Sequence, residues 1–294
     1  MTYLSFLLLF LGLPLAALLL ALLAARRAPQ ARLTRVAWAA VGAHILLALV
    51  YTTPWDNYLV ATGVWTYARA RVLGVTLGWV PLEEYGFFVL QTLLTGLCAA
   101  LLASRWPARV ARRALLPGWL KLAAVLGLGG LWAAAVWALS SGWKPGTYLG
   151  LELVWALPPI TLQVAVGAQV LWARRHAVLA GLLPMTLYLC AADALAIRAG
   201  VWHIAEAQSL GLFLVGLPIE EGVFFLLTNM LVVFGVTLVV APPVWMPQSL
   251  FRWRGWQHPA KPNRAVAGDL MPRRMSGDGQ AGAASDSATL LTTQ

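Results

Sequence analysis

The chain has 294 residues, of which 60% are hydrophobic and only 11% are charged, and its mean hydropathy is +0.74. Because soluble domains carry about 25% charged residues, this composition excludes an ordinary soluble domain and predicts an all-α integral membrane protein. The net charge of +10 falls mostly on short loops and on the C-terminal segment. There it sets membrane orientation, and it does not indicate a nucleic-acid partner.

The hydropathy pattern predicts about seven transmembrane helices, each near the roughly 20 residues that cross the hydrocarbon core. We expect the first span to be retained with its N-terminus outside, because positive residues follow its apolar stretch and none precede it. The segment 52–80 is too polar for a span, and we expect it to be partly buried or interfacial. The predicted spans are 3–25, 35–51, 81–104, 118–140, 147–173, 178–196 and 211–241.

The distribution of positive charge predicts the orientation of these spans. If seven spans alternate, all Lys and Arg residues fall on one side of the membrane except Arg69, Arg71, Lys144 and Arg198. Positively charged loops stay in the cytoplasm, which predicts an outside N-terminus and a cytoplasmic C-terminus in the cell membrane. The segment 242–294, rich in Pro, Gly, Ser and Ala, is expected to form an interfacial anchor followed by a disordered tail.

The sequence contains an internal duplication. The segment 81–88, PLEEYGFF, returns 137 residues later as 218–225, PIEEGVFF, and the same offset joins further rare residues. The tripeptide Thr2-Tyr3-Leu4 also returns, as 147–149, at a slightly different offset. We therefore predict two three-helix repeats, 1–104 and 147–241, joined by a linking span within 105–146 and followed by 242–294. One linking span keeps the repeats parallel, with a site at their interface.

Paired acids within these repeats predict the chemistry. Carboxylates at bilayer depth are costly and are functional by default. A buried pair of carboxyls favours one protonated and one ionised member, which is an acid/base division of labour. On a helix each acid shares a stripe with an aromatic ring four residues later, and such rings stabilise a cation. The predicted catalytic residues are Glu83, Glu84, Glu220, Glu221, Asp56 and Asp193.

The residues around these acids are predicted to bind an apolar substrate. They are Pro81, Phe87, Phe88, Pro218, Phe224, Phe225, Trp65 and Trp202. Three alternatives stay open at this point. The two aspartates suit a turn or cap role equally well, and the two tryptophans suit interface anchors. Glu152, whose repeat counterpart is Leu7, suits either a site acid or an interfacial residue.

Motifs for metals and cofactors are not found in the sequence. No aspartate-rich diphosphate motif occurs, no Gly-x-Gly-x-x-Gly follows a strand, and the four histidines are scattered. Both cysteines lie within apolar runs and read as small buried hydrophobic residues. We therefore expect no metal and no cofactor.

The doubled Pro-x-Glu-Glu motif on two three-span units resembles the membrane-embedded lycopene cyclase domain, in the form that fuses both halves of the heterodimeric enzyme. The resemblance covers about residues 1–241. It implies a cofactor-free isomerisation in carotenoid biosynthesis, in which an acid protonates the end of a lycopene-like polyene and a base removes a proton after ring closure. It further implies that Glu83 and Glu220 are the principal acid and base, tuned by Glu84 and Glu221, and that the expected rings are β-ionone.

The resemblance implies partners as well as activity: the lipophilic polyene, membrane lipid and other enzymes of carotenoid biosynthesis. Alternatives of the same class are ε or γ rings, a C50 or other carotenoid substrate, and water addition to the same cation. A proton-coupled transporter is an alternative of another class, since paired intramembrane acids and parallel repeats also occur there.

Overall fold

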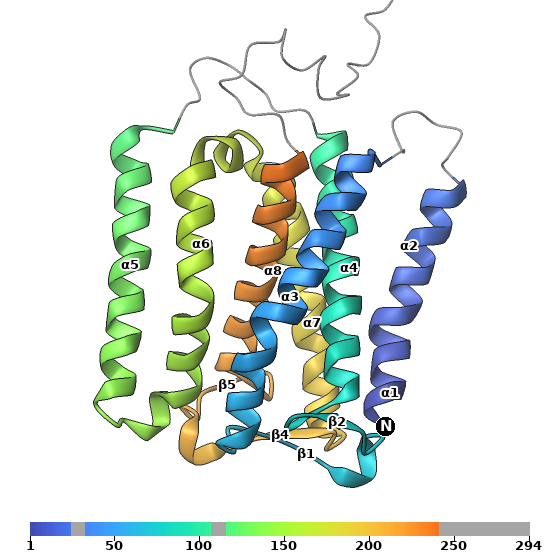
Figure 1. The fold of residues 1–294 in the computed structure, drawn as a ribbon, viewed down its shortest axis with the longest axis vertical. Helices are drawn as coiled ribbons and strands as arrows, with labels where there is room; N and C mark the ends of the chain where they lie inside the picture. Colours follow the sequence, from blue (N-terminus) through green and yellow to red (C-terminus); the bar gives the residue numbers. More distant parts are fainter. Residues whose placement is uncertain (25–32, 107–115, 241–294) are drawn as a thin grey trace, which may run out of the picture. The chain divides into compact units, whose positions relative to one another are not determined.

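The computed structural model describes residues 1–24, 33–106 and 116–240. Within these ranges seven helices are long and apolar enough to cross a membrane, and the chain is a membrane protein (Figure 1). The expected anchor and tail at 242–294 lie outside the described residues.

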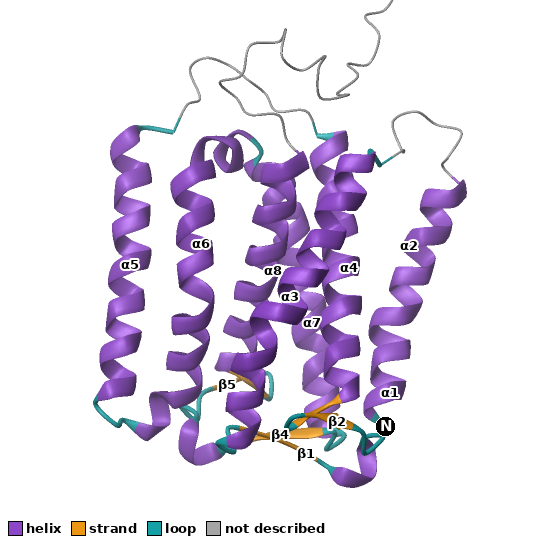
Figure 2. Cartoon of the chain, in the orientation of Figure 1, coloured by secondary structure: helices purple, strands orange, loops and turns teal. Residues whose placement is uncertain are grey.

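The first span consists of α1 (Tyr3–Phe6), a π-helical turn (Leu7–Gly12) and α2 (Leu13–Ala24). The other spanning helices of the described ranges are α3 (Arg35–Ala61), α4 (Leu82–Arg105), α5 (Gly118–Ser140), α6 (Thr147–Ala173), α7 (Arg175–Arg198) and α8 (Ile219–Val240). Short strands follow α3 and α7: β1 (Trp65–Tyr67), β2 (Thr76–Leu77), β3 (Val80–Pro81), β4 (Trp202–Ile204), β5 (Phe213–Leu214) and β6 (Leu217–Pro218). Figure 2 shows these strands gathered at one end of the helices.

Two predicted spans were wrong at one end. The second span, predicted to stop at residue 51, continues as α3 to Ala61. Its polar residue Asp56 is buried against other helices, so a polar side chain there does not end the span. The last span, predicted from residue 211, begins only at Ile219. The preceding residues turn back on themselves instead, with Gly211 and Gly216 at positive φ.

Each half carries a two-residue hairpin immediately before its Pro-x-Glu-Glu motif. The β2–β3 hairpin turns at Gly78, whose φ is +69°. The β5–β6 hairpin turns at Val215 and Gly216, with φ of +53° and +83°. Such turns need positive φ, which glycine supplies at no steric cost and a β-branched valine does not. The hairpins end in Pro81 and Pro218, so α4 and α8 start at equivalent points.

Strands β1 and β4 join the two halves. They pair antiparallel, with Trp65 opposite Ile204, Thr66 opposite His203 and Tyr67 opposite Trp202. Thr66 and His203 are repeat equivalents, so the two halves meet symmetrically about this pair, as a two-fold axis requires. Figure 1 shows this sheet and both hairpins at the same end as the N-terminus. The repeats are therefore parallel, as predicted.

Helices α4 and α8 form the centre of the helix bundle. They pack on each other, while α3 packs on α8 and its counterpart α7 packs on α4. A buried polar node fixes this interface: Asn229 accepts hydrogen bonds from Gln91 at 2.9 Å and Thr95 at 3.0 Å, and donates to Thr186 at 3.1 Å. Polar contacts of this kind hold helices together where the surrounding lipid is as apolar as the side chains. Helix α5 packs mainly on α6, at one edge.

Candidate active site

The second acid of each motif points into the protein, where a phenol contacts it. Tyr3 donates a hydrogen bond to Glu84 Oε2 at 2.5 Å, and Tyr148, its repeat equivalent, donates to Glu221 Oε1 at 2.8 Å. All four side chains are buried. Phenol donors to a carboxylate replace the water that burial removes, so each half holds one glutamate in a fixed orientation.

The surroundings of these two glutamates are not the same. Glu84 Oε2 accepts a second phenol hydrogen bond, from Tyr67 at 2.8 Å, and the residue equivalent to Tyr67 is Ile204. Burial raises the pKa of the Tyr67 hydroxyl well above its ordinary value, and the nearby Glu84 and Asp56 carboxyls raise it further. Tyr67 therefore stays a hydrogen-bond donor. Glu221 accepts a phenol hydrogen bond from Tyr148 alone among the described residues.

The first acid of each motif faces its own preceding loop. Glu83 Oε1 accepts a hydrogen bond from the backbone N–H of Leu73 at 2.5 Å. Glu220 Oε1 accepts one from the backbone N–H of Leu210 at 2.6 Å and another from Ser209 at 3.0 Å. Leu73 and Leu210 are repeat equivalents, so the contact is duplicated. It ties each loop to the start of its helix.

The two aspartates also lie in the cluster but have unequal partners. Asp193 Oδ1 accepts a hydrogen bond from Trp202 Nε1 at 2.9 Å. Among the described residues, neither oxygen of Asp56 has a hydrogen-bond partner, and nor does Trp65 Nε1. The hydrogen bond between Trp202 and Asp193 in the second half therefore has no equivalent between Trp65 and Asp56 in the first. Asp56 and its counterpart Asp193 are both buried.

A small cavity of about 30 Å³ brings the inward acids of both halves together. It lies beside the β1–β4 sheet, which contributes three of its lining side chains. Its lining consists of Tyr3, Trp65, Tyr67, Glu84, Phe87, Asp193, Trp202, Glu221, Phe224 and Phe225. The site is thus single and shared by the repeats, with carboxyls and aromatic faces around one space. Such faces stabilise a passing carbocation without reacting with it.

The aromatic rings around this cavity are packed against one another. The Phe225 ring lies 6.3 Å from Phe87 and 5.3 Å from Phe224, and Trp65 lies 5.6 Å from Phe224. Each tryptophan packs on the tyrosine of the other half: Trp65 lies 5.6 Å from Tyr148, and Trp202 lies 4.9 Å from Tyr3. The halves therefore build each other's acid site.

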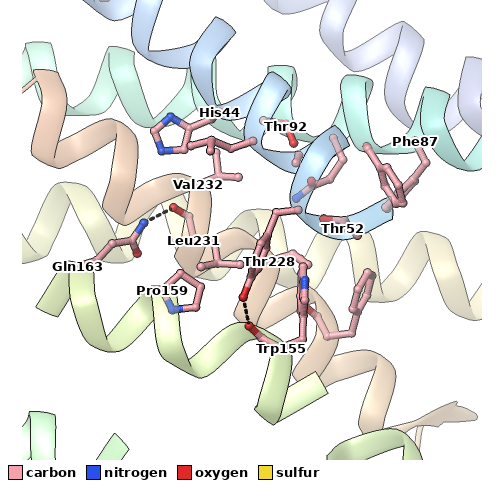
Figure 3. Close-up of a pocket in the computed structure, with 16 residues that line it drawn as sticks. His44, Thr52, Phe87, Thr92, Trp155, Pro159, Gln163, Thr228, Leu231 and Val232 are labelled. Atoms are coloured by element: carbon pink, nitrogen blue, oxygen red, sulfur yellow. Dashed lines mark hydrogen bonds between the residues drawn. The ribbon is translucent and has the colours of Figure 1, made fainter. Parts of the chain in front are cut away.

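A larger cavity of about 230 Å³ adjoins the small one and shares Phe87 and Phe224 with it. It lies between α3, α4, α6 and α8, and Figure 3 shows side chains from these helices lining it. Its wall on α8 runs from Phe224 to Val232, which is eight steps along the helix, or about 12 Å at the helical rise. The lining is mostly apolar, with His44 and Gln163 toward the end away from the acids.

The larger cavity reaches the outer surface of the helix bundle. Leu47 and Tyr51 line it and are 59% and 45% exposed. The Tyr51 hydroxyl donates to the carbonyl of Trp155 at 2.8 Å and Trp55 Nε1 to that of Leu151 at 3.0 Å, joining α3 to α6 near the acids. The cavity is therefore open to the side of the helix bundle beside Leu47 and Tyr51.

The structure places the remaining predicted residues outside the small cavity. Phe88 lines only the larger one, so the ring beside Glu84 in the small cavity is Phe87, not the Phe88 that four-residue spacing suggested. Pro81 and Pro218 are buried in β3 and β6 and set the helix starts. Pro218 also lines a groove of about 560 Å³ between α7, α8 and the second hairpin.

Sequence reasoning did not identify the three phenols as site residues. Tyr3 and Tyr148 were visible as part of the duplicated tripeptide, which was a usable signal. Tyr67 gave none, because its counterpart is Ile204. Across the part of the chain that the structure describes, no three His, Cys, Asp or Glu side chains are placed to hold a metal ion.

Comparison with known proteins identifies the family. The family model described as lycopene cyclase matches residues 1–102 and 147–239, which is more than half of the chain. The chain belongs to the lycopene cyclase family. Each of the two matched segments contains one Pro-x-Glu-Glu motif. The unmatched segment between them contains α5.

Individual relatives agree with this assignment. A protein named lycopene beta-cyclase from Halobacterium salinarum is 43% identical over 256 residues, covering 86% of this chain and 99% of that protein. A bifunctional lycopene cyclase/phytoene synthase from Colletotrichum graminicola is 41% identical over 202 residues, covering 65% of this chain and 34% of that protein. No solved structure matches the chain.

Proposed function

We propose that this protein is a lycopene cyclase that closes rings at the ends of an acyclic carotenoid by proton transfer. One observation carries the proposal: Glu84 and Glu221, one from each half, face the same small aromatic-walled cavity. Membership of the family and the name of the Halobacterium relative support lycopene as the substrate and β rings as the product. They also favour a cyclase over a proton-coupled transporter.

The reaction needs one acid and one base, and no net oxidation or reduction. The acid protonates the terminal double bond of the polyene, forming a tertiary carbocation. The neighbouring double bond attacks that cation and closes a six-membered ring, and a base then removes a proton. The carboxyls of the small cavity provide both functions, and the rings of Phe87, Phe224 and Phe225 stabilise the cation between the two proton transfers.

We propose that Glu84 and Glu221 are the principal acid/base pair, in place of the Glu83 and Glu220 that the sequence suggested. Glu83 and Glu220 accept backbone hydrogen bonds from their own loops and do not line the small cavity. A general acid must reach the atom that it protonates, and of the four glutamates of the two motifs only Glu84 and Glu221 line this cavity. Asp193 and Asp56 act as their partners. Trp65 and Trp202 form walls of the site.

The larger cavity is proposed to hold the polyene behind its reacting end. Its apolar walls suit a hydrocarbon chain, and its opening beside Leu47 and Tyr51 suits entry from the bilayer. Because the lycopene-like substrate dissolves in lipid, no aqueous path to the site is needed. Membrane lipid and enzymes that make or use the carotenoid are the expected partners.

The orientation of the chain is also a proposal: the N-terminus outside and the C-terminus in the cytoplasm of the cell. The distribution of positive charge supports it. Four Lys and Arg residues lie near the end that carries the hairpins, and the others belong to the opposite side; the four are Arg69, Arg71, Lys144 and Arg198. Arg71 donates to the backbone carbonyl of Met1 at 2.8 Å. Labelling of single cysteines placed in the 62–80 loop from outside intact cells tests this; labelling only after lysis would reverse the orientation.

We propose the domain division expected from the sequence, with repeats at 1–104 and 147–241, a linking span within 105–146 and a separate segment at 242–294. The symmetric pairing of β1 with β4 supports two equivalent repeats. Co-expression of residues 1–146 and 147–294 as two chains tests it. Recovery of product only when both are present is expected, and product from one piece alone would contradict a shared site.

The decisive test is expression of the chain in a bacterium that accumulates lycopene, followed by chromatography of the pigments. We expect β-ring products. The matched control is the Glu84→Gln/Glu221→Gln double variant at an equal amount in the membrane. Unchanged lycopene with the unaltered chain would contradict lycopene as the substrate, and product from the double variant would contradict the acid/base assignment.

A further inference from the structure

A groove at the hairpin end of the second half is not used by the proposed reaction. It lies between α7, α8 and the β5–β6 hairpin and has a volume of about 560 Å³. Its lining is apolar except at Arg198, the last residue of α7. The groove is open to the side of the helix bundle, because Leu187 and Leu195 in its wall are 70% and 47% exposed. Its volume is that of a site for a small molecule.

The equivalent place in the first half is filled by two side chains. Tyr85 is buried there, and its hydroxyl donates to the carbonyl of Leu77 in the hairpin at 3.0 Å. Asn57 donates to the same hydroxyl at 3.2 Å and accepts a hydrogen bond from the backbone N–H of Trp79 at 2.7 Å. These contacts hold the β2–β3 hairpin against α3 and α4. The first half therefore has packed side chains where the second half has a groove.

The second half lacks both of these side chains. Gly222 stands at the position of Tyr85, and Ala194 stands at that of Asn57. Both small residues line the groove, and a Cβ added at Gly222 would have open space around it. The groove is therefore open because two residues of the second half are small, although the duplicated backbone is the same.

Arg198 places a positive charge at one end of this groove. Its counterpart in the first half is Ala61, so the cation accompanies the open groove and not the filled position. Arg198 Nη2 donates to the carbonyl of Val215 at 2.9 Å, which holds the hairpin without filling the groove. A guanidinium has five N–H donors, so others remain for an anion, and a phosphate group accepts two of them side by side.

The length of the groove corresponds to one leaflet of a bilayer. Along α7 it runs from Arg198 to Leu187, which is eleven steps of the helix, or about 16 Å. Half of the hydrocarbon core of a bilayer is about 15 Å thick. A spanning helix of another chain would pack along about 30 Å, twice the length of the groove. An apolar groove one leaflet deep with a cation at its outer end therefore fits a single lipid molecule.

We propose that this groove binds one anionic phospholipid, with the phosphate on Arg198 and an acyl chain along Gly222 and Ala194. The chain covers the wall that Tyr85 and Asn57 cover in the first half. A headgroup that also carries an amine or choline would neutralise its own phosphate, so a headgroup with a net negative charge binds Arg198 more tightly. The site shares no side chain with the small cavity and does not rest on the cyclase function.

The test measures the lipid that the full-length protein retains in detergent, without lycopene. Native mass spectrometry counts bound phosphatidylglycerol, whose headgroup has a net negative charge, and phosphatidylcholine, whose headgroup is neutral, with identical acyl chains. We expect one tightly held phosphatidylglycerol, with a Kd about tenfold lower than that of phosphatidylcholine. Arg198→Gln should remove this preference, because the amide has no charge. Arg69→Gln is the matched control, since it removes a cation at the same end that does not line the groove.

Filling the groove is the second arm of the test. Gly222→Tyr copies the first half and should abolish the tightly held lipid, because the ring occupies the space of the acyl chain. Gly222→Leu fills the same space with a smaller side chain and should weaken retention. Ala61→Arg places the same cation beside the filled position of the first half and should add no second lipid. Added phosphatidylglycerol should raise the Tm of the unaltered protein and leave that of Gly222→Tyr unchanged.

Four results would overturn the proposal. Equal retention of both lipids, or a preference that survives Arg198→Gln, would show that Arg198 does not select the headgroup. A tightly held lipid that survives Gly222→Tyr would lie elsewhere on the protein. A dimer that forms without lipid and dissociates in Gly222→Tyr would make a second copy of the chain the occupant. Failure of both Gly222 variants to fold would show that the groove is not free space.

Discussion

The two halves of this protein place the same glutamate in the same cavity and surround it differently. Glu84 accepts hydrogen bonds from two phenols, Tyr3 and Tyr67. Glu221 accepts one, from Tyr148, and lines the small cavity together with the Asp193 carboxyl. The duplicated backbone therefore sets where the acids lie, while unmatched side chains decide how each acid behaves. A symmetric scaffold holds an asymmetric site, as a reaction with one acid and one base requires.

The largest expected effect comes from removing either inward acid. Glu84→Gln or Glu221→Gln should each lower ring closure about 10²- to 10⁴-fold, because a side-chain amide neither gives nor takes the proton. Chromatography of the pigments measures it. Each variant should lose both rings equally, since both halves build one cavity. A one-ring product from either variant would indicate two independent sites and would contradict a single cavity shared by both halves.

The phenols should have smaller and unequal effects. Tyr148→Phe should slow the reaction about ten- to hundredfold, since it removes the phenol from Glu221 and a hydrogen bond to a charged group contributes about 1.5–3 kcal/mol. Tyr3→Phe should slow it less, because Glu84 keeps the Tyr67 hydroxyl. Tyr3→Phe/Tyr67→Phe should match Tyr148→Phe. Initial rates in reconstituted membranes measure this, and equal effects of the two single variants would contradict the asymmetry.

The Tyr67 phenol also allows a prediction about pH. Loss of its proton above its pKa would remove the donor to Glu84, and burial raises that pKa well above the ordinary value. The hydroxyl is therefore retained as the solution becomes moderately alkaline. The ratio of unaltered to Tyr67→Phe rates should be the same at neutral and at moderately alkaline pH. A ratio that falls toward one with rising pH would show that Tyr67 ionises.

The tryptophans should differ in stability more than in rate. Trp202→Phe removes the donor to Asp193 and leaves a buried carboxyl oxygen unpaired, which costs about 1–3 kcal/mol. Trp65→Phe removes a buried N–H that has no partner among the described residues, so it should cost less. Thermal unfolding in detergent compares the two. A lower Tm for Trp65→Phe than for Trp202→Phe would show that Trp65 has a partner in the working protein.

The smallest effect on rate is expected for the outward acids. Glu83→Gln and Glu220→Gln keep an oxygen that accepts the backbone hydrogen bonds of Leu73 and Leu210. The rate should stay within about tenfold, because neither residue faces the small cavity. Pigment yield at matched protein amounts measures it. Abolished cyclisation in these variants would restore Glu83 and Glu220 as the principal pair.

The sequence alone determined the class of protein and most of its architecture. Hydropathy located the spans 118–140 and 147–173 at the bounds that α5 and α6 have. The doubled motif and the odd linking span predicted parallel repeats, and the pairing of β1 with β4 agrees. These features depend on local composition and on counting, which a single chain displays directly. Where polar residues lie inside a span, as Asp56 does in α3, composition gave the wrong end.

Only the tertiary structure decided which acids face the site. Glu83 and Glu84 are adjacent on one helix, so their side chains point in directions about 100° apart, and the sequence ranks neither first. The neighbouring helices settle it, because Tyr3 reaches Glu84 from 81 residues away and the Leu73 loop reaches Glu83. The counterpart of Tyr67 is Ile204, which is not a phenol, so the repeat gave no signal for it. Contacts between distant segments depend on how helices pack, and this protein's site consists of such contacts.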